Sequence, residues 1–265
     1  MVYAVLGVAG LIIGSFLGSL TWRLPHRMSI VGPWSVCPFC KKNLRWYHNI
    51  PLVSYLILGG RCAYCHKTIS VRYPLVEGGT AALFMLVGWS FLGTDNVRIV
   101  GVMRDYQGWM GVWVLPFFLI VAAGLIAIAI IDLEHQIIPD KLLFPLLIFN
   151  FSFLILFSPS PTVFVHFAWG GFAASFFFVI YLLTRGRGMG LGDVSMSFLL
   201  GVLLGYPGTI VALFTAFLTG AAVGTILVLA GRARFGRPIP FGPFLIFGTF
   251  VALFISNTIV QWYLP

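Results

Sequence analysis

The sequence predicts an all-α polytopic membrane protein with about eight transmembrane helices and one small hydrophilic insert. Hydrophobic residues make up 60% of the 265-residue chain, charged residues make up 9%, and the mean hydropathy is +1.01. These values are far from those of soluble globular proteins. The apolar residues also occur in runs close to the length of about 20 residues that a helix needs to cross a bilayer. The insert holds all four cysteines.

The first apolar run, residues 2–22, has no positive charge before it and is followed by Arg23 and Arg27. A cleavable signal peptide has the opposite charge order. We therefore expect this run to be a retained transmembrane helix.

Polar residues, glycines and prolines separate the later apolar runs. The sixth run is short, and only a tight Tyr206-Pro207-Gly208 turn parts it from the seventh, so these two could be one broken helix. The expected spans lie near residues 2–22, 75–93, 110–132, 142–158, 163–184, 193–205, 208–230 and 241–262.

The positive residues predict the orientation, because cytoplasmic loops are enriched in Lys and Arg. With the N-terminus outside, fourteen of the sixteen Lys and Arg residues fall on the cytoplasmic side, and only Arg98 and Arg104 fall outside. The net charge of +9 is mostly this topology signal, so we do not expect nucleic-acid binding. The cytoplasmic residues are Arg23, Arg27, Lys41, Lys42, Arg45, Arg61, Lys67, Arg72, Lys141, Arg185, Arg187, Arg232, Arg234 and Arg237.

The insert, residues 23–73, carries two Cys-x-x-Cys motifs, Cys37/Cys40 and Cys62/Cys65, with 21 residues between them. Paired motifs of this kind are typical of a tetrahedral zinc-thiolate site in a zinc ribbon. Disulfides are the first alternative, but this loop is expected in the reducing cytoplasm. A thioredoxin-like redox pair is a second, although the flanking strand and helix pattern is missing. The zinc would be structural, since so small a segment buries little core.

Two further features of the insert are open to more than one interpretation. Residues 49–58 are unusually apolar and would pack on the membrane surface, on the helix bundle or as a strand of the ribbon. Glu77, in the sequence Arg72-Tyr-Pro-Leu-Val-Glu77, is expected in the first turn of the second span. It would be either a helix cap or a functional acid near the membrane.

Two polar islands, residues 132–140 and 188–193, adjoin apolar runs. Each places a carboxylate, Asp132 or Asp193, at the end of an expected membrane helix on the cytoplasmic side. Ordinary solvated helix ends are the simple alternative, because charges at the membrane boundary cost little. The chain has only seven acidic residues, however, and three of them lie in the first island. We therefore predict that Asp132 and Asp193 form a catalytic pair.

A pair of carboxylates can hydrolyse a peptide bond when one is ionised and takes a proton from water while the other is protonated and polarises the carbonyl. Gly188, Gly190 and Gly192 precede Asp193, and without side chains they would let an extended substrate approach it. Loop flexibility would explain them equally well. A nucleotide-binding loop is not expected, because the glycines lie between apolar runs. His135 is expected to be a surface or supporting residue.

These motifs resemble those of the type IV prepilin peptidase family of membrane aspartic proteases. The resemblance rests on Asp132 with Ile138-Pro139-Asp140, on Gly190-Leu191-Gly192-Asp193, on the two cysteine pairs and on Arg72 to Glu77. It covers essentially the whole chain. One departure is Ser195, where the family usually has Lys or Arg two residues after its second aspartate.

The resemblance implies that Asp132 and Asp193 are catalytic and remove the basic leader of prepilin or pseudopilin precursors at the cytoplasmic face of the bacterial inner membrane. It also implies methylation of the new N-terminus with S-adenosylmethionine, an activity associated with the cysteine-bearing segment. The expected organisation is a first helix at residues 1–22, a four-cysteine zinc-binding insert at 23–73 and a transmembrane protease domain at 74–265.

Two other classes of function compete. An ion-coupled transporter would use acidic residues near the middle of the membrane, often in two similar halves, and neither feature is evident. A membrane scaffold whose zinc ribbon recruits partners would explain the cysteines but not the glycine-aspartate island.

Overall fold

The computed structural model describes residues 1–29, 36–37, 39–92, 102–186, 188–231 and 239–263. Five residues of the charge count, Arg98, Arg187, Arg232, Arg234 and Arg237, lie outside this part of the chain. The chain forms two compact units, Met1–Leu92 and Gly93–Pro265. The predicted division at residues 22 and 73 stays a prediction.

The predicted all-α membrane class is confirmed. Within the described ranges, six helices are long and apolar enough to cross a membrane, and a shorter apolar helix covers Gly242–Ser256. The first helix, α1 (Val2–Arg23), matches the expected first span.

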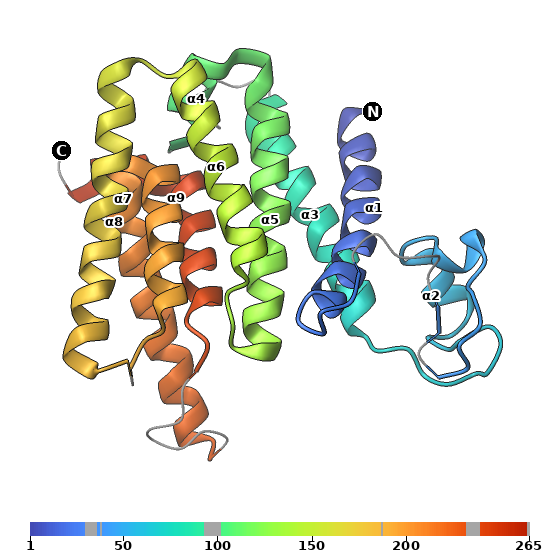
Figure 1. Cartoon of the computed structure of the whole chain (residues 1–265). Helices are drawn as coiled ribbons and strands as arrows, with labels where there is room; N and C mark the ends of the chain where they lie inside the picture. The colour runs from blue at the N-terminus through green and yellow to red at the C-terminus, as the bar shows by residue number, and fades with distance from the viewer. Residues whose placement is uncertain (30–35, 38, 93–101, 187, 232–238, 264–265) are drawn as a thin grey trace. The chain divides into compact units, whose positions relative to one another are not determined.

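Helices α1 and α3 (Arg72–Leu92) form the helical part of the first unit and lie side by side (Figure 1). Glycines at four-residue intervals allow this contact, since they let two backbones approach closely. A Cβ on Gly10 would lie 2.6 Å from the Cα of Ala81, and one on Gly14 would lie 2.7 Å from the Cα of Glu77. The α1 surface toward α3 therefore depends on residues without side chains.

The insert joins α1 to α3 and contains little regular structure. It comprises a short 3-10 helix, η1 (Trp46–Asn49), a one-turn helix, α2 (Val53–Ile57), and two isolated antiparallel bridges, Val36 with Asn43 and Arg61 with Thr68. The apolar segment at residues 49–58 therefore folds partly as a helix. The alternative that it forms a ribbon strand is wrong.

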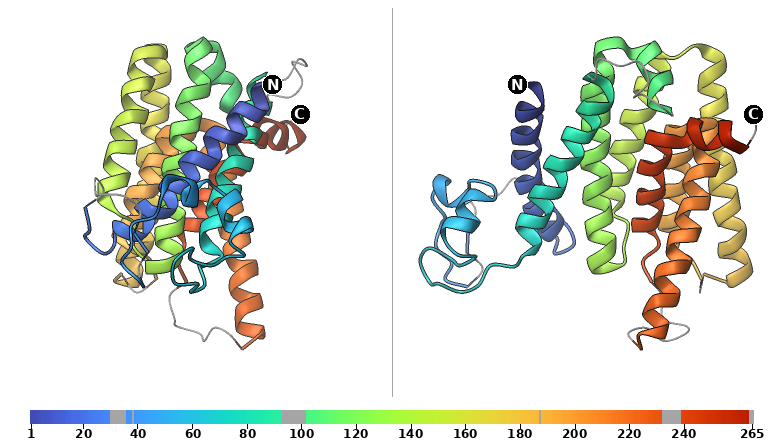
Figure 2. Two further views of the ribbon diagram at one scale, coloured as in Figure 1. Left: turned by 90° about the vertical axis from the view of Figure 1, so that its right-hand side faces the viewer. Right: turned by 180° about the vertical axis from the view of Figure 1, so that it is seen from behind.

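The second unit is a helical bundle in which α8 packs between α7 and α9 (Figure 2). Helix α5 contacts both α6 and α9, and each of these two helices also contacts α8. The described elements are α4 (Val102–Met110), η2 (Gly111–Trp113), α5 (Val114–His135), α6 (Asp140–Phe157), α7 (Ser160–Thr184), α8 (Leu191–Leu229) and α9 (Gly242–Tyr263).

Helix α8 covers both the sixth and the seventh expected spans, and a kink at Gly205 and Tyr206 divides it into two helices, so the expected turn between these spans is present. Its backbone leaves the helical conformation at Gly205 and Tyr206 and resumes at once. Pro207 has no N–H for the Leu203 carbonyl, which instead accepts a hydrogen bond of 2.9 Å from the Tyr106 hydroxyl. The Val202 carbonyl accepts one of 2.8 Å from Nδ1 of His166. The turn therefore joins two helices, and side chains satisfy the carbonyls at the end of the first one.

Candidate aspartic active site and metal site

Asp132 lies in the last turn of α5, which ends at His135. Gln136 follows in the left-handed conformation, and its N–H donates to the Asp132 carbonyl over 2.9 Å. The Asp132 side chain is only 5% exposed. A buried carboxylate needs a hydrogen-bond donor, and the backbone N–H of Gly242 supplies one over 3.0 Å.

Gly242 is the first residue of α9, so its N–H is one of the donors that the helix itself cannot satisfy. The position cannot hold a side chain without a shift, because a Cβ there would lie 2.5 Å from Oδ2 of Asp132. Sequence analysis missed this residue, which is 110 positions from its partner. A glycine followed by a proline at the start of the last apolar run is a signal for a helix N-terminus. This signal does not indicate that the helix N-terminus contacts Asp132.

Asp193 is the third residue of α8. Its Oδ2 accepts the N–H of Gly190 over 3.1 Å. A helix N-terminus favours a negative charge, and this applies both to Asp193 in α8 and to Asp132 beside the start of α9. The two carboxylates are close enough that the charge of Asp193 acts on Asp132. The fold therefore brings together two acids that are far apart in the sequence.

The three predicted glycines have different surroundings. Gly192 packs against the first island, and a Cβ there would lie 3.1 Å from the Cβ of Ile138. Gly188 and Gly190 are exposed, and a Cβ on Gly190 would make only ordinary contacts, the nearest at 3.6 Å with Asp193. None of the three has a positive φ. A Cβ on Gly188 would lie 3.0 Å from Cγ2 of Thr184. Close packing therefore gives both Gly192 and Gly188 a structural reason to lack a side chain, whereas Gly190 has room beside it.

Two residues near the pair have modest roles. His135 is exposed, as expected of a surface residue. The hydroxyl of Ser195 donates to the Leu191 carbonyl of its own helix over 3.2 Å, so this position contributes no charge beside Asp193.

The four cysteines of the insert gather in one cluster, and their sulfur atoms all lie within 4.8 Å of one another. The two motifs have the same backbone pattern. The N–H of Cys37 bonds the Lys42 carbonyl, and the N–H of Cys62 bonds the Lys67 carbonyl. The carbonyls of the same two cysteines accept the N–H groups of Lys41 and His66, both of which have positive φ. Each motif is therefore a compact turn that directs two thiols to a common centre.

The sulfur geometry fits a metal better than a disulfide. The Sγ atoms of Cys37 and Cys65 are 3.8 Å apart, whereas a disulfide bond is about 2.05 Å long. Tetrahedral zinc-thiolate bonds of about 2.3 Å would place neighbouring sulfurs at about this separation. All four cysteines are free thiols. The cluster is a site that could bind a metal ion.

The metal-free thiols differ in acidity. Burial opposes ionisation of Cys37, but the N–H groups of Cys40 and Phe39 favour its thiolate, and its pKa falls to about 7. For Cys65 the Lys67 N–H favours the thiolate, but burial and the neighbouring thiols raise the pKa to about 11. A cation is needed for all four to be ionised together at neutral pH.

Glu77 is not a helix cap, contrary to one of the two interpretations. Helix α3 begins at Arg72, which places Glu77 in its second turn. The carboxylate is buried, with 8% exposure, and accepts the Leu52 N–H of the insert over 2.8 Å. The Arg72 guanidinium donates to the Gly18 carbonyl and the Thr21 hydroxyl of α1. Glu77 therefore attaches the insert to α3, and Arg72 joins the start of α3 to α1.

Comparison with known proteins decides the family. Residues 8–91 match the bacterial peptidase A24 N-terminal domain, and residues 119–225 match the type IV leader peptidase family. The chain is 33% identical to the prepilin leader peptidase/N-methyltransferase of Pseudomonas aeruginosa, over 96% of this chain and 91% of that protein. The chain belongs to the type IV leader peptidase family.

Other members of the type IV leader peptidase family are similar over nearly their whole length. The prepilin leader peptidase/N-methyltransferase of Bacillus subtilis is 32% identical over 98% of this chain and 97% of that protein. The protein of the same description from Legionella pneumophila is 30% identical over 99% of this chain and 94% of that protein. No solved structure matches the chain significantly. The two family matches cover both the helix pair with its insert and the helices that bear the aspartates.

Proposed function

We propose that the protein is a membrane aspartic endopeptidase that cleaves the basic leader from type IV prepilin or pseudopilin precursors, with Asp132 and Asp193 as its catalytic residues. The observation that carries this proposal is the approach of the two carboxylates at neighbouring helix ends, each held by one backbone N–H. Membership of the type IV leader peptidase family supplies the substrate class.

The chemistry follows from two carboxylates that share one proton, because two close carboxylates do not both ionise readily. The ionised acid removes a proton from a water molecule, which attacks the scissile carbonyl carbon. The protonated acid donates a hydrogen bond to the carbonyl oxygen, so that the charge that develops there is stabilised. The tetrahedral intermediate then collapses, the C–N bond breaks, and the departing nitrogen receives a proton from the pair. Gly242 and Gly190 keep one oxygen of each carboxylate in place.

The cysteine cluster would hold a structural zinc ion through Cys37, Cys40, Cys62 and Cys65. Its support is the set of four converging thiols in a segment with few buried apolar side chains. Zinc supplies cross-links between the two motifs, and such sites couple folding to metal binding. The two matching turns position the ligands.

A second activity is proposed from the names of the relatives. The protein would transfer the methyl group of S-adenosylmethionine to the amine that cleavage creates, releasing S-adenosylhomocysteine and a proton. We associate this step with the cysteine insert. The residues that bind S-adenosylmethionine remain unassigned.

The active site is proposed to face the cytoplasm from the bacterial inner membrane. Support comes from the Lys and Arg distribution, which places both polar islands on the positive side, and from the six helices suited to span a bilayer within the described ranges.

The test is an assay of the purified, lipid-reconstituted protein with a prepilin and S-adenosylmethionine. Mass spectrometry should detect a product that lacks the leader and carries one added methyl group. An intact precursor after prolonged incubation with protein of verified fold would contradict the peptidase assignment. A product that lacks the leader but carries no added methyl group would contradict only the methyltransferase assignment.

A further inference from the structure

The insert presents an apolar surface to solvent, which we call the α2 face and define as Trp46, Val53, Leu56 and Ile57. The last three occupy positions i, i+3 and i+4 of α2 and therefore share one side of the helix. Leu56 and Ile57 are 76% and 78% exposed, and Trp46 is 75% exposed. The packing of the insert does not require these side chains.

Tyr55 shows that α2 has two distinct sides. Its hydroxyl donates to the Ile69 carbonyl over 3.4 Å, and its ring lies against Gly60. The side that bears Tyr55 thus packs on residues that flank the second cysteine motif, while the side chains of the α2 face are exposed. Exposed clusters of large apolar side chains usually mark a contact surface.

The charge of the insert has a single sign. Between Arg23 and Val76 the chain has eight Lys and Arg residues and no Asp or Glu. Four thiolates on a divalent cation would lower this positive charge without reversing it. The surface that the α2 face contacts should therefore be both apolar and anionic. The basic residues are Arg23, Arg27, Lys41, Lys42, Arg45, Arg61, Lys67 and Arg72.

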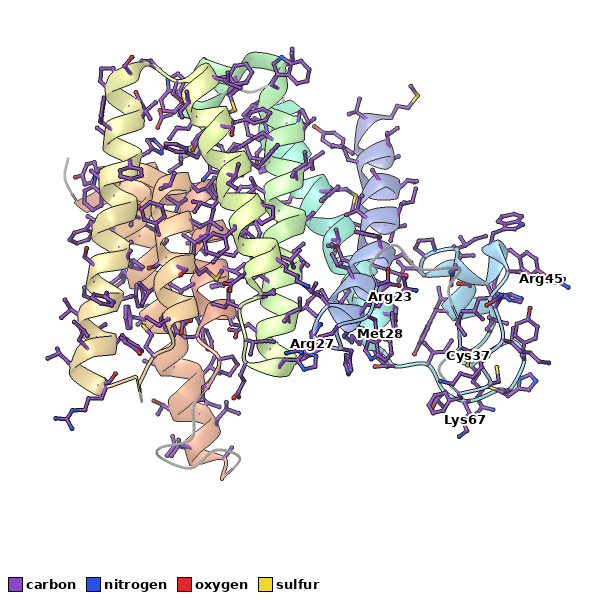
Figure 3. The ribbon with its side chains drawn as sticks, viewed as in Figure 1. Arg23, Arg27, Met28, Cys37, Arg45 and Lys67 are labelled. Carbon is purple, nitrogen blue, oxygen red and sulfur yellow. The ribbon has the colours of Figure 1, made fainter. Side chains whose placement is uncertain are left out.

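The attachment of α2 places it at the end of a membrane helix. The N–H of Leu52, the residue before α2, bonds the carboxylate of Glu77 in the second turn of α3. The insert leaves α1 near Arg23 and Arg27, and Cys37 and Lys67 lie within it (Figure 3). Both helices that hold the insert have the length and composition of membrane spans. The hydrogen bond between Leu52 and Glu77 therefore holds the α2 face near the start of α3, where that helix reaches the membrane surface.

We propose that the α2 face inserts into the interfacial layer of the bilayer, where the basic residues of the insert contact anionic lipid headgroups. Apolar side chains on one face of a helix, flanked by Lys and Arg, bind membrane interfaces in this way, and Trp side chains favour the same layer. A bilayer with anionic headgroups is apolar and anionic at once and already adjoins both ends of the insert. Docking would hold the cysteine cluster against the membrane.

The test places a fluorescent amino acid at Ile57 of the full chain, reconstituted in lipid nanodiscs with brominated acyl chains that quench nearby fluorophores. A second variant carries the same fluorophore at Val53, so that a folding defect in one protein leaves the other to decide. The matched control carries it at Thr68, which is exposed on the same insert but outside the α2 face.

Docking predicts strong quenching at 57 and 53, at a depth of about 5–10 Å from the headgroup boundary, and little quenching at 68. Quenching should be stronger with anionic than with neutral lipids and should weaken with salt. Equal quenching at 57 and 68, or none at 57 and 53, would overturn the proposal. Equal quenching in neutral and anionic bilayers would overturn the assignment to an anionic surface. A fluorophore at 57 that responds to added precursor protein but not to lipid would assign the face to a protein instead.

Discussion

The cysteine insert and the aspartate site hold their side chains in place by different physical means. In the insert, four thiols converge from two short turns, and much of the surrounding apolar surface is exposed. At the aspartate site, long packed helices end beside one another, and backbone N–H groups bind the carboxylates. The first arrangement needs a bound cation to become rigid, whereas the second is rigid through helix packing.

This difference implies that the two regions can fail separately. Loss of the metal should loosen the insert and leave the helix ends that bear Asp132 and Asp193 in place. Changes at those helix ends should stop cleavage and leave the metal bound.

Asp132→Asn and Asp193→Asn should each reduce cleavage by on the order of 10⁴-fold or more, because neither variant retains the carboxylate pair and such residues act as a unit. Glu134→Gln makes the same chemical change in the same turn of α5 and serves as the control, with activity near that of the wild type. Rates of leader removal and metal content should be measured together. Near wild-type cleavage by either Asp variant would contradict the assignment of Asp132 and Asp193 as a catalytic pair.

Gly242→Ala should lower cleavage by about 10²-fold, because a Cβ that displaces the Asp132 carboxylate by even about 1 Å spoils the geometry of the pair. The unchanged carboxylate makes this a test of positioning, so the loss should appear in kcat rather than in KM. Gly171→Ala is the matched control, since a Cβ there has no neighbour within 4 Å. Equal activity of the two glycine variants would contradict the need for a residue without a side chain beside Asp132.

The sequence was sufficient to predict the helices and the position of Asp132 and Asp193 at helix ends, because apolar runs and charged interruptions are local signals. It could not predict the N–H of Gly242 beside Asp132, since that contact depends on how α5 and α9 pack. Glu77 was misplaced for a related reason. The start of α3 at Arg72 rather than a few residues later moved this acid from a capping position to a contact with Leu52.

Glu77→Ala should loosen the insert by about 1–3 kcal/mol, because the partly buried Leu52 N–H loses its acceptor. Hydrogen exchange of the Leu52 amide should become faster while cleavage is retained. Glu134→Gln is again a suitable comparison, as an acid outside the insert. Unchanged exchange at Leu52 would show that the contact does not hold the insert.

Gly192→Ala and Gly190→Ala separate two reasons for the glycine-rich island. Close packing of Gly192 on Ile138 predicts a loss of about ten-fold or less for Gly192→Ala, from a small shift of Asp193, and a smaller effect for Gly190→Ala. If the glycines instead serve substrate approach, Gly190→Ala should be the more harmful change and should act mainly on KM. Steady-state kinetics of both variants distinguishes the two outcomes.

The most direct test of the separation between the two regions is the product mass from Cys37→Ser, compared with wild type and Asp193→Asn. Each lipid-reconstituted protein is incubated with a prepilin and S-adenosylmethionine, and its zinc is quantified. We expect about one zinc per chain in the wild type and in Asp193→Asn, and its loss in Cys37→Ser. We also expect that Cys37→Ser still removes the leader but adds no methyl group, while Asp193→Asn leaves the precursor intact. A metal-free Cys37→Ser protein that cannot cleave, or one that methylates normally, would contradict the separation of the two regions.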